Sequence, residues 1–112
     1  MNYSISKENE IIVIKLEDEK VGYPGLEEFQ QILNAKIDEG EKKLLLDLAS
    51  VKFLDSFGIG ILVGAHRKLS GQGGTLKLSG VNDRIMMSLT ITRLDKMLEI
   101  HDDLPSALDS FA

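Results

Sequence analysis

Leu54-Asp55-Ser56-Phe57-Gly58-Ile59-Gly60-Ile61-Leu62 is the stretch around which the rest of this chain is organised. It follows an apolar run at residues 43–48 and opens a helical pattern that continues to about residue 70, so Ser56 lies at or next to a helix N-cap. A serine hydroxyl there accepts a hydrogen bond from a free N–H of the first turn. A phosphate is also favoured there, because a helix N-terminus carries roughly half a positive charge. We therefore interpret Ser56 as a helix cap when unmodified and as a switch when phosphorylated.

The composition is that of a single globular domain spanning residues 1–112, with 43% apolar and 28% charged residues. The net charge of −5 and the absence of a run of Lys or Arg argue against a nucleic-acid partner. There is no cysteine, which excludes disulfides and thiolate metal sites, and the two histidines lie far apart. We expect no metal and no cofactor.

Nothing in the sequence indicates a membrane partner. The longest apolar run, residues 58–65, is about half of the ~20 residues that span a bilayer. Residues 1–4 lack both the charged and the apolar part of a signal peptide. We expect a cytoplasmic protein, monomeric when free.

Strand patterns alternate with helical ones along the chain. The predicted strands are residues 3–6, 10–16, 43–48, 75–79 and 98–100. The predicted helices are residues 26–39, 56–70, a short one that Asn82 caps and that runs through Leu89, and a terminal one from Asp102 or Asp103 with the stripe Leu104, Leu108 and Phe111. This order predicts an α/β fold with a small, mostly parallel sheet of about four or five strands and about four helices.

The helix after Ser56 has two apolar faces. The side predicted to pack on the sheet carries Ile59, Leu62, Val63, His66 and Leu69. Phe57 and Ile61 lie roughly opposite, with Gly60 and Gly64 alongside. This arrangement predicts a small exposed apolar patch beside Ser56, and the alternative is that a neighbouring element covers both bulky side chains.

Motifs that would indicate an enzyme are missing. Gly58-x-Gly60 lacks the third glycine of a dinucleotide fingerprint, because residue 63 is Val, and no Gly-Lys-Ser/Thr phosphate loop occurs. Ser56 is not in a nucleophile elbow, since Leu54 stands where a glycine is required. We therefore predict no catalytic residue.

Two other titratable residues receive structural interpretations. His66 is ten residues from Ser56, about 15 Å by helix rise, and is interpreted as a satisfied, partly buried histidine. Asp47 and Asp55 are not accompanied by the acids and lysine of an aspartyl-phosphate site. Asp47 is interpreted as a solvated residue at a strand end.

The stretch Leu46-Asp47-Leu48-x-x-Val51-x-Phe53-Leu54-Asp55-Ser56-Phe57-Gly58-Ile59-Gly60-Ile61-Leu62 resembles the central motif of STAS domains, in particular of bacterial anti-sigma factor antagonists. The likeness extends over nearly the whole chain. It implies a partner-switching regulator of transcription. In that scheme the unphosphorylated protein binds an anti-sigma factor, itself a serine kinase, and frees the sigma factor. Phosphorylation breaks the complex, and a serine phosphatase restores it.

Carried over by position, the resemblance implies that Ser56 is the phosphoacceptor. The residues implied or predicted to contact the partner are Tyr23, Asp55, Phe57, Gly58, Gly60, Ile61 and Gly64. Two features depart from the family pattern. Phe57 stands where members usually have Ser or Ala, and residues 18–23 lack the usual Gly-x-Leu/Ile-Asp of the loop after the second strand.

Two alternative functions stay open at this point. In the first, the domain is an interaction scaffold in a larger signalling or lipid-transport complex and Ser56 is never phosphorylated, which the bulky Phe57 favours. In the second, the chain is a small enzyme or nucleotide-binding protein.

Overall fold

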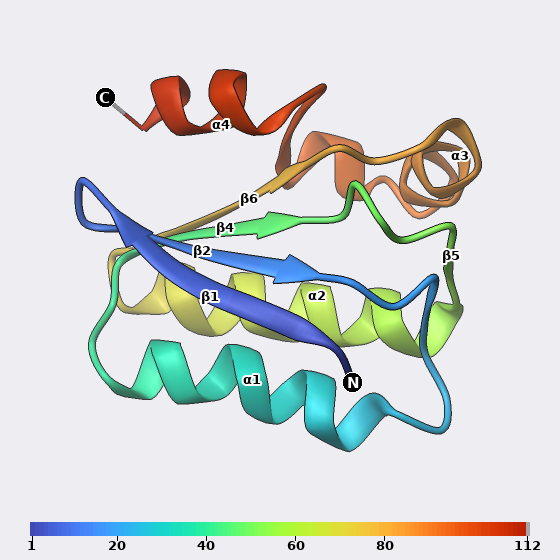
Figure 1. Ribbon diagram of the computed structural model, residues 1–112, viewed down its shortest axis with the longest axis horizontal. Helices are drawn as coiled ribbons and strands as arrows, with labels where there is room; N and C mark the ends of the chain where they lie inside the picture. The colour runs from blue at the N-terminus through green and yellow to red at the C-terminus, as the bar shows by residue number, and fades with distance from the viewer. Residues whose placement is uncertain (112) are drawn as a thin grey trace.

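The computed structural model describes residues 1–111, which form a mixed sheet with helices on both faces (Figure 1). The strands, in the spatial order β1-β2-β4-β6-β7, are β1 (Tyr3–Glu8), β2 (Ile11–Leu16), β4 (Lys43–Asp47), β6 (Thr75–Ser79) and β7 (Glu99–His101). β1 is antiparallel to β2, and the other pairings are parallel. The predicted α/β fold with a small, mostly parallel sheet is confirmed.

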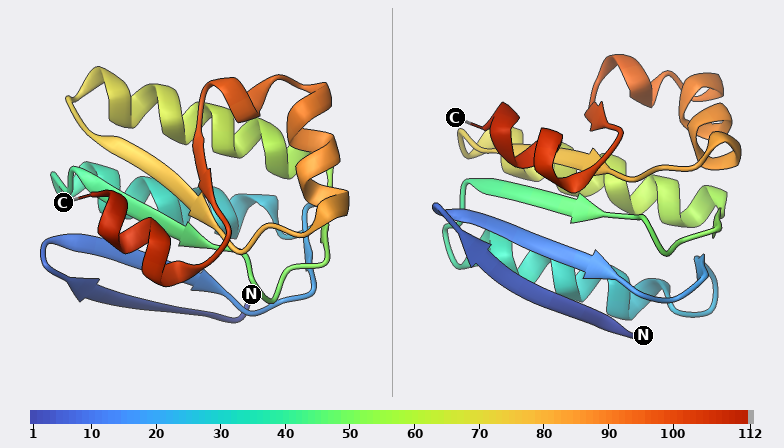
Figure 2. Two further views of the ribbon diagram at one scale, coloured as in Figure 1. Left: turned by 90° about the horizontal axis from the view of Figure 1, so that it is seen from above. Right: turned by 45° about the horizontal axis from the view of Figure 1, so that its top comes forward.

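The helices are α1 (Leu26–Asp38), α2 (Ser56–Gly71), α3 (Asp83–Ile91) and α4 (Leu104–Ser110), with a 3₁₀ turn, η1 (Leu94–Lys96), before β7. α1 and α2 lie side by side on one face of the sheet, α4 covers the other face, and α3 lies at one end (Figures 1 and 2). None of the helices in residues 1–111 has the length and apolar character needed to cross a membrane.

The two central strands β2 and β4 contribute alternate residues to two cores. Ile12 and Ile14 of β2 belong to the larger core with α1 and α2, whereas Ile11 and Val13 belong to the smaller core beneath α4. All four are buried. The prediction that β2 is covered on both faces is therefore confirmed, and burial of both faces accounts for its continuous apolar sequence.

The element boundaries differ from the predicted ones by one or two residues, for local reasons. Asn9 and Glu10 have positive φ values of 49° and 67° and form the two-residue turn between β1 and β2, so β2 begins one residue later than expected. Gly40 has a φ of 90° and ends α1, as predicted. Asn82 caps α3 by accepting a 2.8 Å hydrogen bond from the N–H of Ile85, also as predicted.

Two short strands that the sequence did not predict form a second, small sheet. β3 (Lys20–Val21) pairs in parallel with β5 (Phe53–Leu54). Each strand has only two residues, which is too few to show an alternating apolar pattern in the sequence. Their pairing brings the loop after β2 beside the N-terminus of α2, where Ser56 lies.

Two predictions about single residues are corrected. Asp47 is buried, with 5% of its surface exposed, and accepts hydrogen bonds from Ala49 N–H (3.1 Å) and Ser79 O–H (3.4 Å), so it is not a solvated strand end. His66 is half-buried as predicted, but its Nδ1 atom has no hydrogen-bond partner among residues 1–111, so it is not satisfied.

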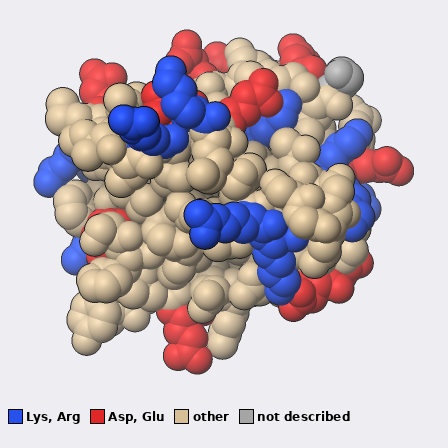
Figure 3. Space-filling view, turned by 180° about the vertical axis from the view of Figure 1, so that it is seen from behind, with Lys and Arg blue, Asp and Glu red and all other residues tan. Residues whose placement is uncertain are grey.

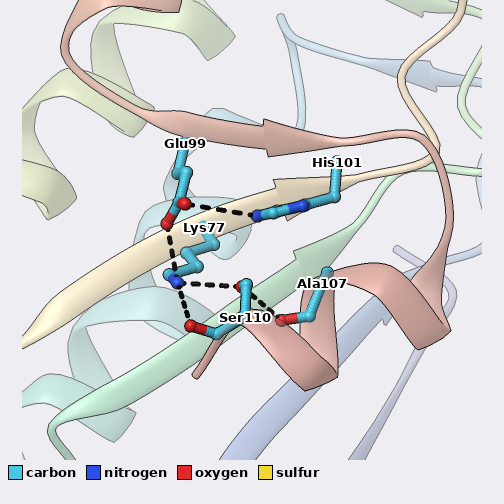
Figure 4. Close-up of polar contacts among 5 residues, drawn as sticks. All are labelled: Lys77, Glu99, His101, Ala107 and Ser110. Carbon is cyan, nitrogen blue, oxygen red and sulfur yellow. Dashed lines mark hydrogen bonds and ion pairs between the residues drawn. The ribbon is translucent and has the colours of Figure 1, made fainter. Parts of the chain in front are cut away.

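α4 is held against the sheet by a buried lysine (Figure 4). Lys77 is 7% exposed, and its Nζ atom lies 2.6 Å from Glu99 Oε2 on the neighbouring strand. The same ammonium donates to the carbonyl oxygen (3.0 Å) and to Oγ (2.8 Å) of Ser110 in α4. The Ser110 hydroxyl in turn donates to the Ala107 carbonyl, and His101 Nε2 lies 3.6 Å from Glu99 Oε1. All the donors of this ammonium are thus used, as a buried charge requires.

Candidate functional site

Asp55, not Ser56, caps α2. The Asp55 backbone is extended, and its Oδ1 atom accepts a 2.8 Å hydrogen bond from the N–H of Gly58. Ser56 is the first helical residue and is exposed. The prediction that Ser56 acts as the cap is therefore wrong. The reason is that only the residue before the first helical one has the extended backbone that directs its side chain onto the first-turn N–H groups.

The second oxygen of Asp55 binds the loop after β3. Oδ2 accepts a 2.8 Å hydrogen bond from the N–H of Tyr23. Gly22 is buried directly beside this contact, and a Cβ atom added there would overlap the Asp55 carboxylate. This loop is the one that departs from the family pattern, and its glycine leaves room for Asp55. This contact is not evident from the sequence, because nothing in residues 21–25 indicates a partner 32 positions away.

These contacts keep the Asp55 carboxylate ionised. Partial burial opposes ionisation, but hydrogen bonds from the backbone N–H groups of Gly58, Tyr23 and Phe57, together with the charge of Lys20, hold the pKa of Asp55 below its usual value. A negative charge therefore lies immediately before Ser56 at neutral pH.

The Ser56 hydroxyl makes no hydrogen bond within residues 1–111, and the side chain is exposed. Beside it lies a mainly apolar crevice of about 440 Å³ between the start of α2 and α3. Its walls include Phe53, Ile59 and Ile91, and Ser88 contributes a hydroxyl group. A serine in this setting is open to an enzyme that modifies it, but no group of residues 1–111 is hydrogen-bonded to it as a base would be.

Phe57 and Ile61 differ in exposure. Phe57 is 64% exposed, as predicted, whereas Ile61 is half-buried and packs against the larger core. Both line a groove of about 440 Å³ between α1 and α2. Gly60 and Gly64 lie in the same groove, are exposed and have open space where a Cβ atom would stand. Ile61 was predicted to be exposed beside Phe57, with cover by a neighbouring element as the alternative. The alternative holds for Ile61 in part, because its side chain is half-buried against the larger core.

Gly58 lies behind this surface. It is buried, and a Cβ atom there would overlap the side chain of Leu54 and stand 3.2 Å from the Val21 carbonyl oxygen. Gly58 therefore allows α2 to approach the small β3–β5 sheet closely, and it supports the surface without forming part of it.

Large apolar side chains are exposed on the loop after β3, on α2 and on α3, and of these Ile91 lines the crevice beside Ser56. Tyr23 is 67% exposed, Phe57 64%, Met87 65% and Ile91 75%. We call Tyr23, Asp55, Ser56, Phe57 and Ile91 the Ser56 surface. Figure 3 shows that uncharged side chains cover broad areas of the molecule on the side turned away from the viewer in Figure 1. Met87 and Ile91 were not among the residues predicted from the sequence to be exposed here, although their spacing of four residues places them on one side of a helix.

The arrangement is suited to recognition of another protein. Within residues 1–111 no group of three His, Asp or Glu side chains is placed to hold a metal ion. The site offers instead a free hydroxyl, one ionised carboxylate, a helix N-terminus and exposed apolar side chains. Such a surface can bind a protein partner and can change its charge through modification of Ser56.

Comparisons with known proteins show the family and the fold of this chain. A sequence profile of the STAS domain matches residues 4–107. A relative from Thermotoga neapolitana, named as a homologue of an anti-sigma factor antagonist, is 30% identical over 101 residues, which cover 89% of each chain. An anti-sigma factor antagonist from Mycobacterium paratuberculosis has a similar crystal structure, with a TM-score of 0.88 at 21% identity over 97% of this chain and 92% of that one.

The Bacillus cell fate determinant SpoIIAA has a similar fold. Its phosphorylated form matches with a TM-score of 0.78 at 18% identity, covering 99% of this chain and 100% of that one. Its unphosphorylated form matches with a TM-score of 0.73 at 18% identity, covering 98% and 97%.

Proposed function

This chain belongs to the STAS domain family and resembles its anti-sigma factor antagonists, and on that basis we propose that phosphorylation of Ser56 switches its binding to an anti-sigma factor. The unphosphorylated protein binds the anti-sigma factor, which is itself a serine kinase, and so frees the sigma factor. The kinase then phosphorylates Ser56 and the complex dissociates. A serine phosphatase returns the protein to its binding state.

The observation that carries this proposal is that Asp55, and not Ser56, forms the cap of α2. Asp55 caps α2, so the Ser56 hydroxyl is exposed and makes no hydrogen bond among residues 1–111. A kinase can therefore modify Ser56 without breaking the helix start. The new phosphate lies at a helix N-terminus, which favours negative charge. The domain is expected to keep its fold, and the match to both forms of the SpoIIAA relative supports this expectation.

The phosphate weakens binding because a partner would have to cover it. Phosphoserine carries about −1.5 to −2 charges at neutral pH and would lie next to the ionised Asp55. A partner that packs on Phe57 and Tyr23 would remove water from both negative groups at once, which is unfavourable without a new cation. A coupling of ~3 kcal/mol corresponds to roughly 150-fold weaker binding.

Modification and binding are tested separately. The purified protein is incubated with lysate of its native host and ATP, and intact-mass analysis with peptide mapping locates any phosphate. We expect a single phosphate on Ser56 and none on Ser56→Ala. Phosphate found only on other residues would refute the assignment of Ser56.

Binding is then measured against the host's anti-sigma factor kinases. Ser56→Asp should bind about 100-fold more weakly or worse. Ser70→Asp, which places the same charge on an exposed residue of the other end of α2, should bind like the unmodified protein. Equal binding by Ser56→Asp and wild type would contradict the switch.

The exposure of Phe57 favours a second candidate function, a permanent contact in a larger signalling or lipid-transport complex. A scaffold of this kind would keep its partner in Ser56→Asp and lose it in Phe57→Ser. A phosphorylation switch predicts loss of the partner in Ser56→Asp, so this pair of variants distinguishes the two functions.

A further inference from the structure

Two cations lie against the ring of Phe53, which forms part of the wall of the crevice beside Ser56. The guanidinium carbon of Arg84 is 4.6 Å from the ring centroid, and the ammonium nitrogen of Lys20 is 6.0 Å from it. An aromatic ring attracts a cation that lies within about 6 Å of its centroid. Two positive charges therefore border this crevice, although the chain as a whole has a net charge of −5.

The backbone positions both cations. Lys20 is the register partner of Phe53 in the β3–β5 pair. On the other side α3 lies beside β5 (Figure 1), because the Asn82 side chain that caps α3 also donates a 3.1 Å hydrogen bond to the carbonyl of Lys52. Arg84 follows Asn82 by two residues and belongs to the first turn of α3. The fold itself thus sets the place of both charges, which lowers the cost of ordering them when a partner binds.

Both charges are available to a partner. Arg84 and Lys20 are exposed, and neither forms an ion pair with an acidic residue in the part of the chain that the structure describes. Lys20 lies close enough to Asp55 to help lower the pKa of that carboxyl. Both oxygens of Asp55, however, already accept backbone hydrogen bonds from the loop after β3 and from α2. The two cations therefore complement carboxylates that come from outside the chain.

We propose that the partner segment that covers Ser56 is acidic, with carboxylates that pair with Arg84 and Lys20 and an apolar side chain that enters the crevice. The crevice can take such a side chain, because its volume is about 440 Å³ and its walls are mainly apolar, with Phe53 and Ile91 among them. The inference rests on the proposed function for the partner, an anti-sigma factor. The chemistry of the segment follows from the crevice and its two cations.

The direction of the proposed switch agrees with an acidic segment. Phosphorylation of Ser56 adds about −1.5 to −2 charges beside the same crevice. The added charge repels carboxylates and opposes the attraction that Arg84 and Lys20 exert on them. A basic segment would instead bind more tightly to the phosphorylated protein. A partner that phosphorylation releases is therefore expected to be acidic at this place.

A peptide library tests the chemistry of the segment without any assumption about the partner. Phage-displayed random peptides are selected in parallel on wild type and on the double variant Lys20→Glu, Arg84→Glu. We expect wild type to enrich peptides with Asp or Glu close to a large apolar residue, and the double variant to lose this preference.

The matched control is the double variant Arg67→Glu, Lys96→Glu, which changes the net charge equally at two exposed residues outside the crevice and should select like wild type. Enrichment of basic or uncharged peptides by wild type would overturn the proposal. Equal selection by wild type and the Lys20→Glu, Arg84→Glu variant would overturn it as well.

Binding to the host's anti-sigma factor kinases separates this proposal from the proposed function. Arg84→Glu should weaken binding of the unphosphorylated protein roughly tenfold, whereas Arg84→Lys should keep most of the affinity and Arg67→Glu all of it. Arg84 is exposed, and an acid in the first turn of a helix is favourable, so Arg84→Glu should fold, which circular dichroism verifies.

The two proposals fail in different ways. A kinase that Ser56→Asp releases but that binds Arg84→Glu as tightly as wild type would overturn the acidic segment and leave the proposed switch intact. Selection of acidic peptides by wild type, with no kinase bound, would support the acidic segment and refute the anti-sigma factor as its source.

Discussion

The carboxylate of Asp55 accepts a 2.8 Å hydrogen bond from the backbone N–H of Tyr23, 32 residues earlier in the chain. Its other oxygen caps α2 through Gly58. One side chain therefore both begins the helix that carries Ser56 and positions the loop beside it. The shape of the Ser56 surface therefore depends on Asp55, and under the proposed switch its charge would change at Ser56.

Removing the Asp55 side chain should destabilise the domain far more than removing the Ser56 hydroxyl. Asp55→Ala loses a helix cap and a loop contact, and we expect a loss of about 1–2 kcal/mol in the free energy of unfolding. Ser56→Ala loses no hydrogen bond and should stay within about 0.5 kcal/mol of wild type. Urea denaturation measures both, and an equal loss in the two variants would assign the cap to Ser56 after all.

The contribution of Asp55 should disappear in acid. Its folded-state pKa is below its unfolded-state value, which is about 3.9. The stabilisation is therefore present above the unfolded-state pKa and is lost as the pH falls toward the folded-state pKa. Asp55→Asn, which keeps the shape but cannot ionise, should lose less stability than wild type over this acidic range. Denaturation curves at a series of pH values make the comparison, and parallel curves for the two proteins would contradict it.

Two glycines near Ser56 should respond in opposite ways to substitution by alanine. Gly22→Ala places a methyl group against the Asp55 carboxylate and should cost about 1–3 kcal/mol. Gly60→Ala lies inside α2 with open space around the new methyl group and should stabilise the domain by about 0.5–1 kcal/mol. Thermal unfolding compares them. A Gly22→Ala variant as stable as wild type would show that the loop is free to move away from Asp55.

The buried ammonium of Lys77 should be more costly to leave unpaired than to remove. Glu99→Gln removes the charge partner of a 7% exposed lysine, and we expect a loss of about 1–3 kcal/mol. Lys77→Met keeps the apolar stem and leaves Glu99, which is more than half exposed, to water, so the loss should be smaller. Chemical denaturation gives the order, and the reverse order would mean that the cation itself is strongly stabilising.

The helices and strands that could be predicted from the sequence are those whose own residues carry a clear apolar pattern. The strands at residues 43–47 and 75–79 and the helices from Leu26 and Ser56 have long apolar patterns with clear ends, and all are present. β3 and β5 could not be predicted, because each has only two residues and forms a strand only by pairing with the other strand. The burial of Asp47 likewise depends on Ser79, which is distant in sequence.

The same distinction applies to the site. The position of Ser56 at the start of a helix follows from its own neighbourhood in the chain. The cap assignment was one residue off, because capping depends on which residue leaves the helical backbone conformation first. The contact with Tyr23 and the partial burial of Ile61 against α1 arise only when distant segments meet, so no local pattern could indicate them.

The attachment of α4 through Lys77 also has a consequence for the unfolding of the domain. Ala107 is the one fully buried residue among the described residues of this seven-residue helix, whereas α2 buries five. α4 should therefore open and exchange its amide hydrogens at a lower free-energy cost than the strands beneath it. Such an opening would leave α2 and its cap in place. Local unfolding of α4 is thus expected on one face of the sheet, while α2 and the Ser56 surface on the opposite face keep their structure.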